Sequence, residues 1–417
     1  MCRKIAAFMQ CRICAAEGIE PFLSLGKSPP ANNLVPPDNA CPQEQSYPLA
    51  VCFCPKCTTV QLTFTVPPEV MFSHYLYVTS TTKTFRDHFA AMAKSLSGRF
   101  NLSDVSFVID VGSNDGLLLK CFQGYKVRTL GIEPAKNLAE AANREGVETL
   151  NAFLSPSVAG EIAKKHGRAD VVTANNVFAH IPAIHDVVKS VRAMLSPQGA
   201  FVIEVAYLFD MLSDMTFDLI YHEHLFYYSL TSLCKLLSMH GMEVFDVEHV
   251  SSHGGSLRVF VQFRDGPNQV CPSVGEMLSS EKSKGVIKQA TYGAFAQKVQ
   301  EVREELVSYL AELKSEGKRV AAFGYPAKAT TLLNFCGISK QYIDYIVDDN
   351  PLKQGYLAPG THIPIVSSSR FREEKPDYVL ILAWNFAKEI IEKSAWLREQ
   401  GVSFIIPLPK PRILHSA

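Results

Sequence analysis

The sequence predicts an α/β protein in which a small cysteine-rich unit precedes two Rossmann-like units. Three observations support this prediction. Two Cys-x-x-Cys pairs lie near the N-terminus, short apolar strands alternate with helical patterns from residue 105 to about residue 264, and a second strand–helix series begins at Arg319. A length of 417 residues also exceeds what one hydrophobic core usually organises, so several domains are expected.

The composition limits the partners that the protein can have. Lys+Arg and Asp+Glu are equal at 41 each, so there is no overall positive field to hold a nucleic-acid backbone or an anionic membrane. The first ten residues lack the apolar run of a signal peptide, and no later stretch is apolar over the length of a bilayer. We therefore expect a cytoplasmic monomer with no nucleic-acid or membrane partner.

Residues 1–70 are expected to form a small domain that a metal ion holds together. Seven of the eleven cysteines lie within the first 57 residues, and an odd, clustered set fits metal ligation better than a disulfide framework. Two Cys-x-x-Cys turns can supply the four thiolates of a closed, structural zinc site. Cys52 competes with Cys54, although the spacing favours Cys54, and free thiols or a redox pair are the alternative. The predicted ligands are Cys11, Cys14, Cys54 and Cys57.

The central unit is expected at residues 105–265, after a helical connector at residues 71–104. Its alternation of strands and helices predicts an open, mainly parallel sheet that ends in two strands close together in the sequence. The predicted strands are 107–109, 129–132, 171–174, 200–203, 243–247 and 257–261.

A helical linker at residues 266–317 and a second α/β unit at residues 318–417 complete the predicted organisation. The charged, amphipathic stretch 297–318 indicates a helix that leads into the last unit. That unit begins with the apolar run 319–324.

A glycine-containing turn follows the first predicted strand of the central unit. Gly112 and Gly116 allow the backbone to turn closely beneath a ligand, and Glu133, after the next strand, is placed to accept hydrogen bonds from ribose hydroxyls. A dinucleotide fingerprint needs a third glycine, whereas small polar residues fill positions 113–115. Because S-adenosylmethionine has no pyrophosphate, the turn favours that cofactor over NAD. An ordinary strand-to-helix turn is the alternative.

Titratable residues gather in the run Tyr221-His222-Glu223-His224 and in the segment 175–180, which follows a predicted strand. A zincin-type metal site would need His-Glu-x-x-His, and position 226 is Phe. Several titratable groups at one edge of a sheet favour proton abstraction instead. Packed structural histidines are the alternative.

With these motifs, the chain resembles, nearly end to end, the sugar C-methyltransferases that act on nucleotide-linked 4-keto-deoxyhexoses. That family has an N-terminal zinc-binding domain, a central class I S-adenosylmethionine-dependent methyltransferase domain and a C-terminal Rossmann-like domain that binds the nucleotide-sugar. The resemblance implies the same organisation here. Its carriers are the four cysteines and the segments 110–116, 131–135, 175–182, 221–225, 253–258 and 355–365.

The resemblance also implies roles for individual residues around the reacting sugar. His224 matches the general base that removes the proton beside the ketone. Tyr221 and Glu223 match residues around the sugar ring, and His180 matches a second active-site histidine. Tyr75 matches a tyrosine that reaches the site from the connector.

Cofactor and substrate contacts follow from the same resemblance. In the C-terminal unit, Lys328 opens a predicted helix whose N-terminus can face a diphosphate. The residues expected at the cofactor are Asp110, Gly112, Asn114, Gly116, Glu133 and Asn175. The residues expected at the substrate are His222, His253, Ser256, Arg258, Lys328 and Asp348.

The expected function is S-adenosylmethionine-dependent C-methylation of a nucleoside-diphosphate 4-keto-6-deoxysugar, a dTDP-sugar or another nucleotide-sugar, at C3. Methylation at C5 is the nearest alternative. An inactive nucleotide-sugar-binding protein and an NAD-linked sugar oxidoreductase are the alternatives from other classes.

Overall fold

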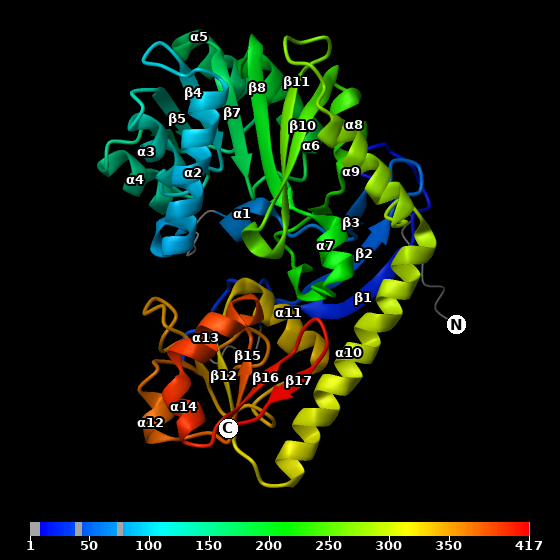
Figure 1. The fold of residues 1–417 in the computed structure, drawn as a ribbon, viewed down its shortest axis with the longest axis vertical. Coiled ribbons are helices and arrows are strands. Elements are labelled where there is room, and N and C mark those ends of the chain that lie inside the picture. The colour runs from blue at the N-terminus through cyan, green and yellow to red at the C-terminus, as the bar shows by residue number, and fades with distance from the viewer. Residues whose placement is uncertain (1–8, 38–43, 73–77, 417) are drawn as a thin grey trace.

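The computed structural model describes residues 9–37, 44–72 and 78–416. Three β-sheets organise this part of the chain. Figure 1 shows the N-terminal strands between an upper, central α/β unit and a lower, C-terminal α/β unit, with one long helix along the side of the N-terminal strands and the C-terminal unit. That helix is α10 (Gln289–Ser315).

The N-terminal sheet is antiparallel, and a strand from the middle of the chain completes it. Its strands are β1 (Pro21–Ser28), β2 (Tyr47–Phe53), β3 (Val60–Leu62) and β9 (Phe226–Tyr227), in that order. The backbone N–H of Leu62 donates to the carbonyl of Leu225 (2.9 Å), and the N–H of Leu225 donates to the carbonyl of Ala179 (2.9 Å). The loop before β9 is therefore fixed between the N-terminal sheet and the central unit.

The central sheet confirms the predicted open α/β arrangement. Its strands are β4 (Phe107–Val111), β5 (Arg128–Ile132), β6 (Thr149–Leu150), β7 (Ala169–Asn175), β8 (Leu195–Ala206), β10 (Met242–Val250) and β11 (Ser256–Phe263). They lie in the order β10-β11-β8-β7-β4-β5-β6, with β10 and β11 antiparallel to their neighbours and the other pairs parallel. Every residue of β4 is buried, as expected where helices cover both faces of a parallel sheet.

Helices α2, α5 and α8 of the N-terminal and central units each begin at a capping side chain. Thr82 caps α2, Ser155 caps α5, and Ser229 forms a capping box at the start of α8. The helical segments are α1 (Pro68–Phe72), η1 (Thr79–Thr81), α2 (Lys83–Arg99), α3 (Leu117–Gln123), α4 (Lys136–Arg144), α5 (Pro156–His166), α6 (Ile184–Met194), α7 (Leu208–Ser213), η2 (Phe217–Leu219), α8 (Leu230–Ser238) and η3 (Ser252–Gly254).

Two helices, α9 (Pro272–Ser283) and α10, connect the central and C-terminal units. Helix α10 begins at Gln289, ahead of the predicted start at residue 297. The added turns are anchored by the buried side chains of Tyr292 and Phe295. Gly293 lies between them and weakens the helical pattern in the sequence.

The C-terminal unit is a second, smaller α/β domain. Its strands are β12 (Val320–Phe323), β13 (Ile346–Val347), β14 (Ile365–Val366), β15 (Tyr378–Ile381), β16 (Ser403–Ile406) and β17 (Arg412–Leu414). The sheet order is β14-β13-β12-β15-β16-β17, parallel except for the last pair. Its helical segments are α11 (Ala327–Cys336), α12 (Arg370–Glu373), η4 (Trp384–Phe386), α13 (Ala387–Lys393) and α14 (Ala395–Glu399). In the described part of the chain, no helix has the length and apolar character needed to cross a bilayer.

Candidate active site and metal centre

The four predicted zinc ligands converge in the N-terminal unit. The Sγ atoms of Cys11, Cys14, Cys54 and Cys57 all lie within 4.8 Å of one another. Soft thiolates at this mutual separation suit a tetrahedral zinc ion, so the residues fit the metal. Cys52 lies outside the cluster, where its thiol contacts Met9 and the carbonyl of Gln61. The geometry thus favours Cys54 over Cys52 as the ligand.

The zinc-binding turns are attached to the central unit. His185, on α6, places its Nε2 atom 2.8 Å from the carbonyl oxygen of Ile13, inside the first Cys-x-x-Cys turn. Lys235, on α8, donates to the carbonyl of Lys56 in the second turn (3.3 Å). The metal centre therefore stabilises the interface with the central unit as well as its own small sheet.

The glycine turn after β4 has the close backbone approach that the sequence predicts. Gly112 and Gly116 have positive φ angles of 68° and 78°. A Cβ atom at Gly112 would lie 2.6 Å from Cγ2 of Val177, and one at Gly116 would lie 2.9 Å from Cγ1 of Val147. No larger residue fits either position without displacing a neighbour.

Glu133 fastens the glycine turn to the end of β5. Its carboxylate accepts hydrogen bonds from the backbone N–H of Asn114 and of Ala135, both at 2.8 Å. Burial raises the pKa of Glu133, and the two N–H donors oppose that rise. Each carboxylate oxygen has a second lone pair, so the residue can also accept from a ribose.

Asp110 and Asn175 lie at the carboxyl ends of the adjacent strands β4 and β7. The Asp110 carboxylate accepts from the hydroxyl of Thr173 (2.6 Å) and from the amide of Asn175 (3.4 Å). Burial raises the pKa of Asp110 to about 7. The buried Oδ1 atom of Asn175 has no hydrogen-bond partner among the described residues, so it remains an acceptor for a ligand. A close glycine turn, a carboxylate and this acceptor fit S-adenosylmethionine.

The connector closes over the same turn. The backbone N–H of Thr79 donates to Oδ1 of Asn114 (3.0 Å), and the N–H of Ser80 donates to Oδ2 of Asp115 (3.2 Å). Tyr75, predicted to reach the site from this connector, lies outside the described residues.

The structure brings three predicted catalytic residues together at the loop before β9. The hydroxyl of Tyr221 lies 2.8 Å from Nε2 of His224, and Nδ1 of His224 lies 2.9 Å from the carbonyl oxygen of Leu219. A carbonyl oxygen only accepts, so Nδ1 carries a proton, and in the neutral imidazole Nε2 then presents its lone pair to Tyr221. The ring of His180 lies 5.1 Å from the ring of His224.

The two intervening residues of the loop are buried against different partners. Glu223 accepts a hydrogen bond from the side-chain amide of Asn32 (2.5 Å). His222 packs edge-on against Tyr47 of β2, and burial lowers its pKa. His222 therefore faces the N-terminal sheet, while Tyr221 and His224 face each other.

A buried carboxylate that the sequence-based analysis missed occupies the end of β8. Glu204 accepts from both Nε and Nη2 of Arg258 (3.0 and 2.9 Å), and its Oε1 lies 2.7 Å from Nε2 of His88. Burial raises the pKa of Glu204, but His88 and Arg258 outweigh burial, so the net pKa is lowered. A single acidic residue within the apolar run 201–206 was the available signal.

Two of the expected substrate residues hold the turn between β10 and β11. Arg258 is paired with Glu204, and the Ser256 hydroxyl donates to the carbonyl of Ser252 (3.0 Å). The backbone of His253 lies in this turn, and its side chain is outside the described part of the structure.

The expected substrate residue Lys328 is largely buried at the junction of the central and C-terminal units. Its Nζ atom donates to Oδ1 of Asn385 (2.8 Å) and lies 3.6 Å from the ring centroid of Trp384. The indole N–H of Trp384 donates to Asp218 of η2 (2.6 Å). Burial lowers the pKa of Lys328 to about 8, and burial raises the pKa of Asp218. Two opposite charges and an aromatic ring thus join the units.

Asp348 follows β13 and organises the neighbouring turns. Its carboxylate accepts from the backbone N–H of Tyr325 (2.6 Å) and of Asn350 (2.9 Å). Lys353 lies 3.7 Å from the same carboxylate. Asp348 therefore fixes the turn that leads into α11, the helix that carries Lys328.

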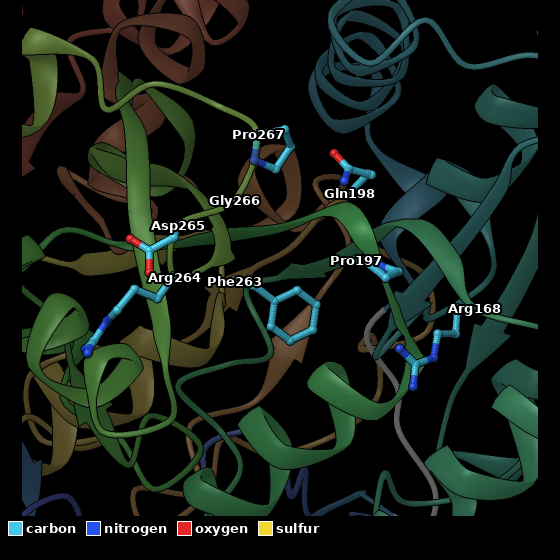
Figure 2. Close-up of a pocket in the computed structure, with 8 residues that line it drawn as sticks. All are labelled: Arg168, Pro197, Gln198, Phe263, Arg264, Asp265, Gly266 and Pro267. Carbon is cyan, nitrogen blue, oxygen red and sulfur yellow. The ribbon is translucent and has the colours of Figure 1, made fainter.

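A surface hollow of about 430 Å³ lies elsewhere, and none of the predicted site residues lines it. It is formed by the amino end of β7, the start of β8 and the turn after β11. Figure 2 shows Arg168 and Arg264 on opposite sides of Phe263, so the two cations do not converge on one anion. Ligands of open α/β sheets bind at the carboxyl ends of the strands, which places the candidate active site at the other edge.

Comparison with known protein families gives three matches along the chain. A zinc binding domain model matches residues 11–72, a methyltransferase domain model matches residues 84–247, and a C-methyltransferase C-terminal domain model matches residues 251–409.

The chain is also similar to individual proteins. The C-methyltransferase NovU of Streptomyces niveus is 39% identical over 407 residues, which cover 98% of this chain and 97% of that protein. Among solved structures, the magnesium protoporphyrin IX methyltransferase of Synechocystis, with S-adenosylmethionine bound, is 13% identical, with a TM-score of 0.33 over 43% of this chain and 79% of its own. The PH0226 protein of Pyrococcus horikoshii is 13% identical, with a TM-score of 0.37 over 48% of this chain and 97% of its own.

Proposed function

Because the chain belongs to the family of zinc-binding, S-adenosylmethionine-dependent C-methyltransferases, we propose that it methylates C3 of a nucleoside-diphosphate 4-keto-6-deoxysugar. The protein is a C-methyltransferase that uses S-adenosylmethionine and has a zinc-binding domain with a cluster of four cysteines. The sugar, its nucleotide and the methylated carbon are the proposal. The observation that carries it is the fixed tautomer of His224 beside Tyr221.

The chemistry requires a base, because a carbon that bears hydrogen beside a ketone is a poor nucleophile. The Leu219 carbonyl holds the proton of His224 on Nδ1, which leaves Nε2 to accept the substrate proton. The Tyr221 hydroxyl is hydrogen-bonded to Nε2, and it can rotate toward the ketone oxygen of a bound substrate. That rotation of the hydroxyl would both free Nε2 and stabilise the developing enolate. After methyl transfer, the proton on Nε2 returns to solvent.

The cofactor side of the proposal uses the turn after β4. Asp110, Asn114, Glu133 and Asn175, with Gly112 and Gly116, would hold S-adenosylmethionine at the carboxyl ends of β4, β5 and β7. When bound, S-adenosylmethionine supplies a sulfonium methyl to the enolate carbon, and the electron pair of the broken carbon–sulfur bond stays on sulfur.

The remaining expected residues are assigned to the substrate within the same proposal. Glu223 and His180 border the Tyr221–His224 pair and would contact the sugar, with Tyr75 entering from the connector. Lys328 and Asp348 would serve the nucleotide-diphosphate end. His222, Ser256 and Arg258 would act indirectly by fixing the walls of the site, and His253 would reach the sugar from the turn between β10 and β11.

Mass spectrometry of a substrate panel tests this function. The panel contains nucleotide-linked 4-keto-6-deoxysugars with and without a 3-hydroxyl group, each incubated with S-adenosylmethionine. We expect a gain of one methyl group on at least one member, and NMR of the product should place it on C3. A methyl group on C5 would replace C3 as the methylated carbon. No methylation of any member would refute the proposed substrate class. Calorimetry with NAD and with S-adenosylmethionine separates the proposed function from the oxidoreductase alternative.

A further inference from the structure

A segment of the N-terminal unit crosses onto the C-terminal unit. We define this strap as residues 29–37, which follow β1. The Thr330 hydroxyl of α11 donates to the carbonyl of Ala31 (3.0 Å). The backbones of Val35 and Leu357 exchange two hydrogen bonds, of 3.0 and 2.8 Å. Ala31 and Val35 are buried, so the C-terminal unit fixes the strap on both sides of Asn32.

The side chain of Asn32 points back to the central unit. Its Nδ2 atom lies 2.5 Å from Oε1 of Glu223, in the loop that also carries Tyr221 and His224. An amide N–H only donates, so its partner is an unprotonated oxygen of the Glu223 carboxyl group. A hydrogen bond to a charged acceptor is short and strong, so it restrains the bonded oxygen of the Glu223 carboxylate.

The loop that bears Glu223 is also held by the C-terminal unit, which holds the strap. The Thr331 hydroxyl, next to Thr330 on α11, donates to the carbonyl of Ile220 (2.8 Å). Successive threonines of one helix thus bind the strap and the loop. Helix α11 therefore contributes directly to the position of Asn32 relative to Glu223.

We propose that Asn32 is a positioning residue that orients the Glu223 carboxylate in the active site, so that α11 of the C-terminal unit controls a side chain of the central unit. This inference rests on the proposed function for its catalytic consequence. No motif in the sequence points to Asn32, because 191 residues separate it from its partner.

A double-mutant cycle tests the inference. Asn32→Ala should lower kcat about tenfold to a hundredfold, because the lost hydrogen bond is to a charged group. In a Glu223→Ala background, which leaves Asn32 no acceptor at this position, the same change should have little further effect, since Asn32 acts through that carboxylate. Asn33→Ala is the matched control, because Asn33 is exposed and adjacent, and it should leave kcat unchanged. Additive losses in the cycle would overturn the inference.

A measurement without substrate separates this inference from the proposed function. With ¹³C-labelled glutamate carboxyl groups, the Glu223 resonance is assigned by its disappearance in Glu223→Gln. In Asn32→Ala the pKa of Glu223 should rise, because the lost donor favoured the charged form. An unchanged titration would overturn the inference even if no sugar is methylated. A raised pKa in a protein that methylates no panel member would support the inference and refute the proposed substrate.

Discussion

The glycine turn after β4 and the loop before β9 are built in different ways. The turn, residues 110–116, belongs to one strand–turn–helix unit, and its main partner, Glu133, directly follows the adjacent strand β5. The loop, residues 219–225, is fixed by partners far away in the sequence: Leu62, Ala179, Asn32 and Thr331. A self-contained element should survive damage elsewhere in the molecule, whereas a loop assembled from three units should not.

Removal of the zinc site is expected to have the largest effect. Zinc sites of this kind contribute on the order of 10 kcal/mol to the folding of their domain. Cys54→Ser should therefore lose zinc and unfold the N-terminal sheet. Because β3 of that sheet holds the loop through Leu225, turnover should be lost, while affinity for S-adenosylmethionine should stay within about twofold by the independence of distant sites. Elemental analysis, calorimetry and a methylation assay measure the three quantities.

Cys52→Ser is the control for that variant. Cys52 is equally buried but lies outside the cluster, so this variant should keep its zinc and its activity. Full metal content in Cys54→Ser would exclude Cys54 as a ligand. Loss of cofactor binding together with zinc would show that the turn depends on the N-terminal unit.

Loss of the proposed base comes next. His224→Ala should lower turnover about a hundredfold to ten-thousandfold, the usual contribution of a general base. Affinity for the cofactor should change little, because the His224 ring is hydrogen-bonded to Tyr221 and Leu219, within the loop before β9. His415→Ala, at an exposed position near the C-terminus, is the control. Turnover near that of the wild type would move the role of base to His180.

The sequence predicts the self-contained elements well for physical reasons. Gly112 and Glu133 belong to a pattern whose spacing follows from one strand, one turn and the next strand. The four cysteines are likewise found as two local pairs, and the structure brings them together. In these cases each local fragment carries its own geometric signal.

The parts that the sequence did not predict are long-range. Strand β9 spans two residues, too short for a periodic pattern, and it pairs with β3 more than 160 residues earlier. Asn32 and Trp384 become recognisable only through their partners. Such contacts depend on how the units pack, which no window of the sequence contains.

Crowding the glycine turn should have a moderate effect, on cofactor affinity and not on zinc content. Gly112→Ala places a Cβ atom 2.6 Å from Val177 at a φ of +68°. Overpacking and left-handed strain each cost about 1–3 kcal/mol, so affinity for S-adenosylmethionine should fall about tenfold to a hundredfold by calorimetry. Zinc content should remain that of the wild type.

Two further variants separate crowding from strain at this turn. Gly146→Ala has a similar φ of +81° with no atom within 4 Å, so it carries the strain alone and should bind the cofactor normally. Val177→Ala combined with Gly112→Ala should recover part of the lost affinity. If Gly146→Ala weakened binding as much as Gly112→Ala, close approach at the turn would not be the cause.

The smallest effect is expected where the C-terminal unit contacts η2. Trp384→Phe keeps a ring beside Lys328 but removes the N–H that donates to Asp218. Asp218 precedes Leu219, whose carbonyl orients His224, so kcat should fall about twofold to tenfold, in line with one lost hydrogen bond. Burial already raises the pKa of Asp218, and loss of the donor should raise it further.

That change in pKa makes the variant's stability depend on pH in a defined direction. A folded-state pKa above the unfolded value means that the native state binds the extra proton, so stability falls as pH rises from about 4 toward the folded pKa. The deficit in Tm of Trp384→Phe should therefore be small near pH 4 and should grow as pH rises. Trp396→Phe, whose ring packs near Arg372, is the control and should show no such trend. If both tryptophan variants changed kcat equally, the contact of η4 with Asp218 would not hold the loop. The strap and α11 would then remain as the link from the C-terminal unit to His224.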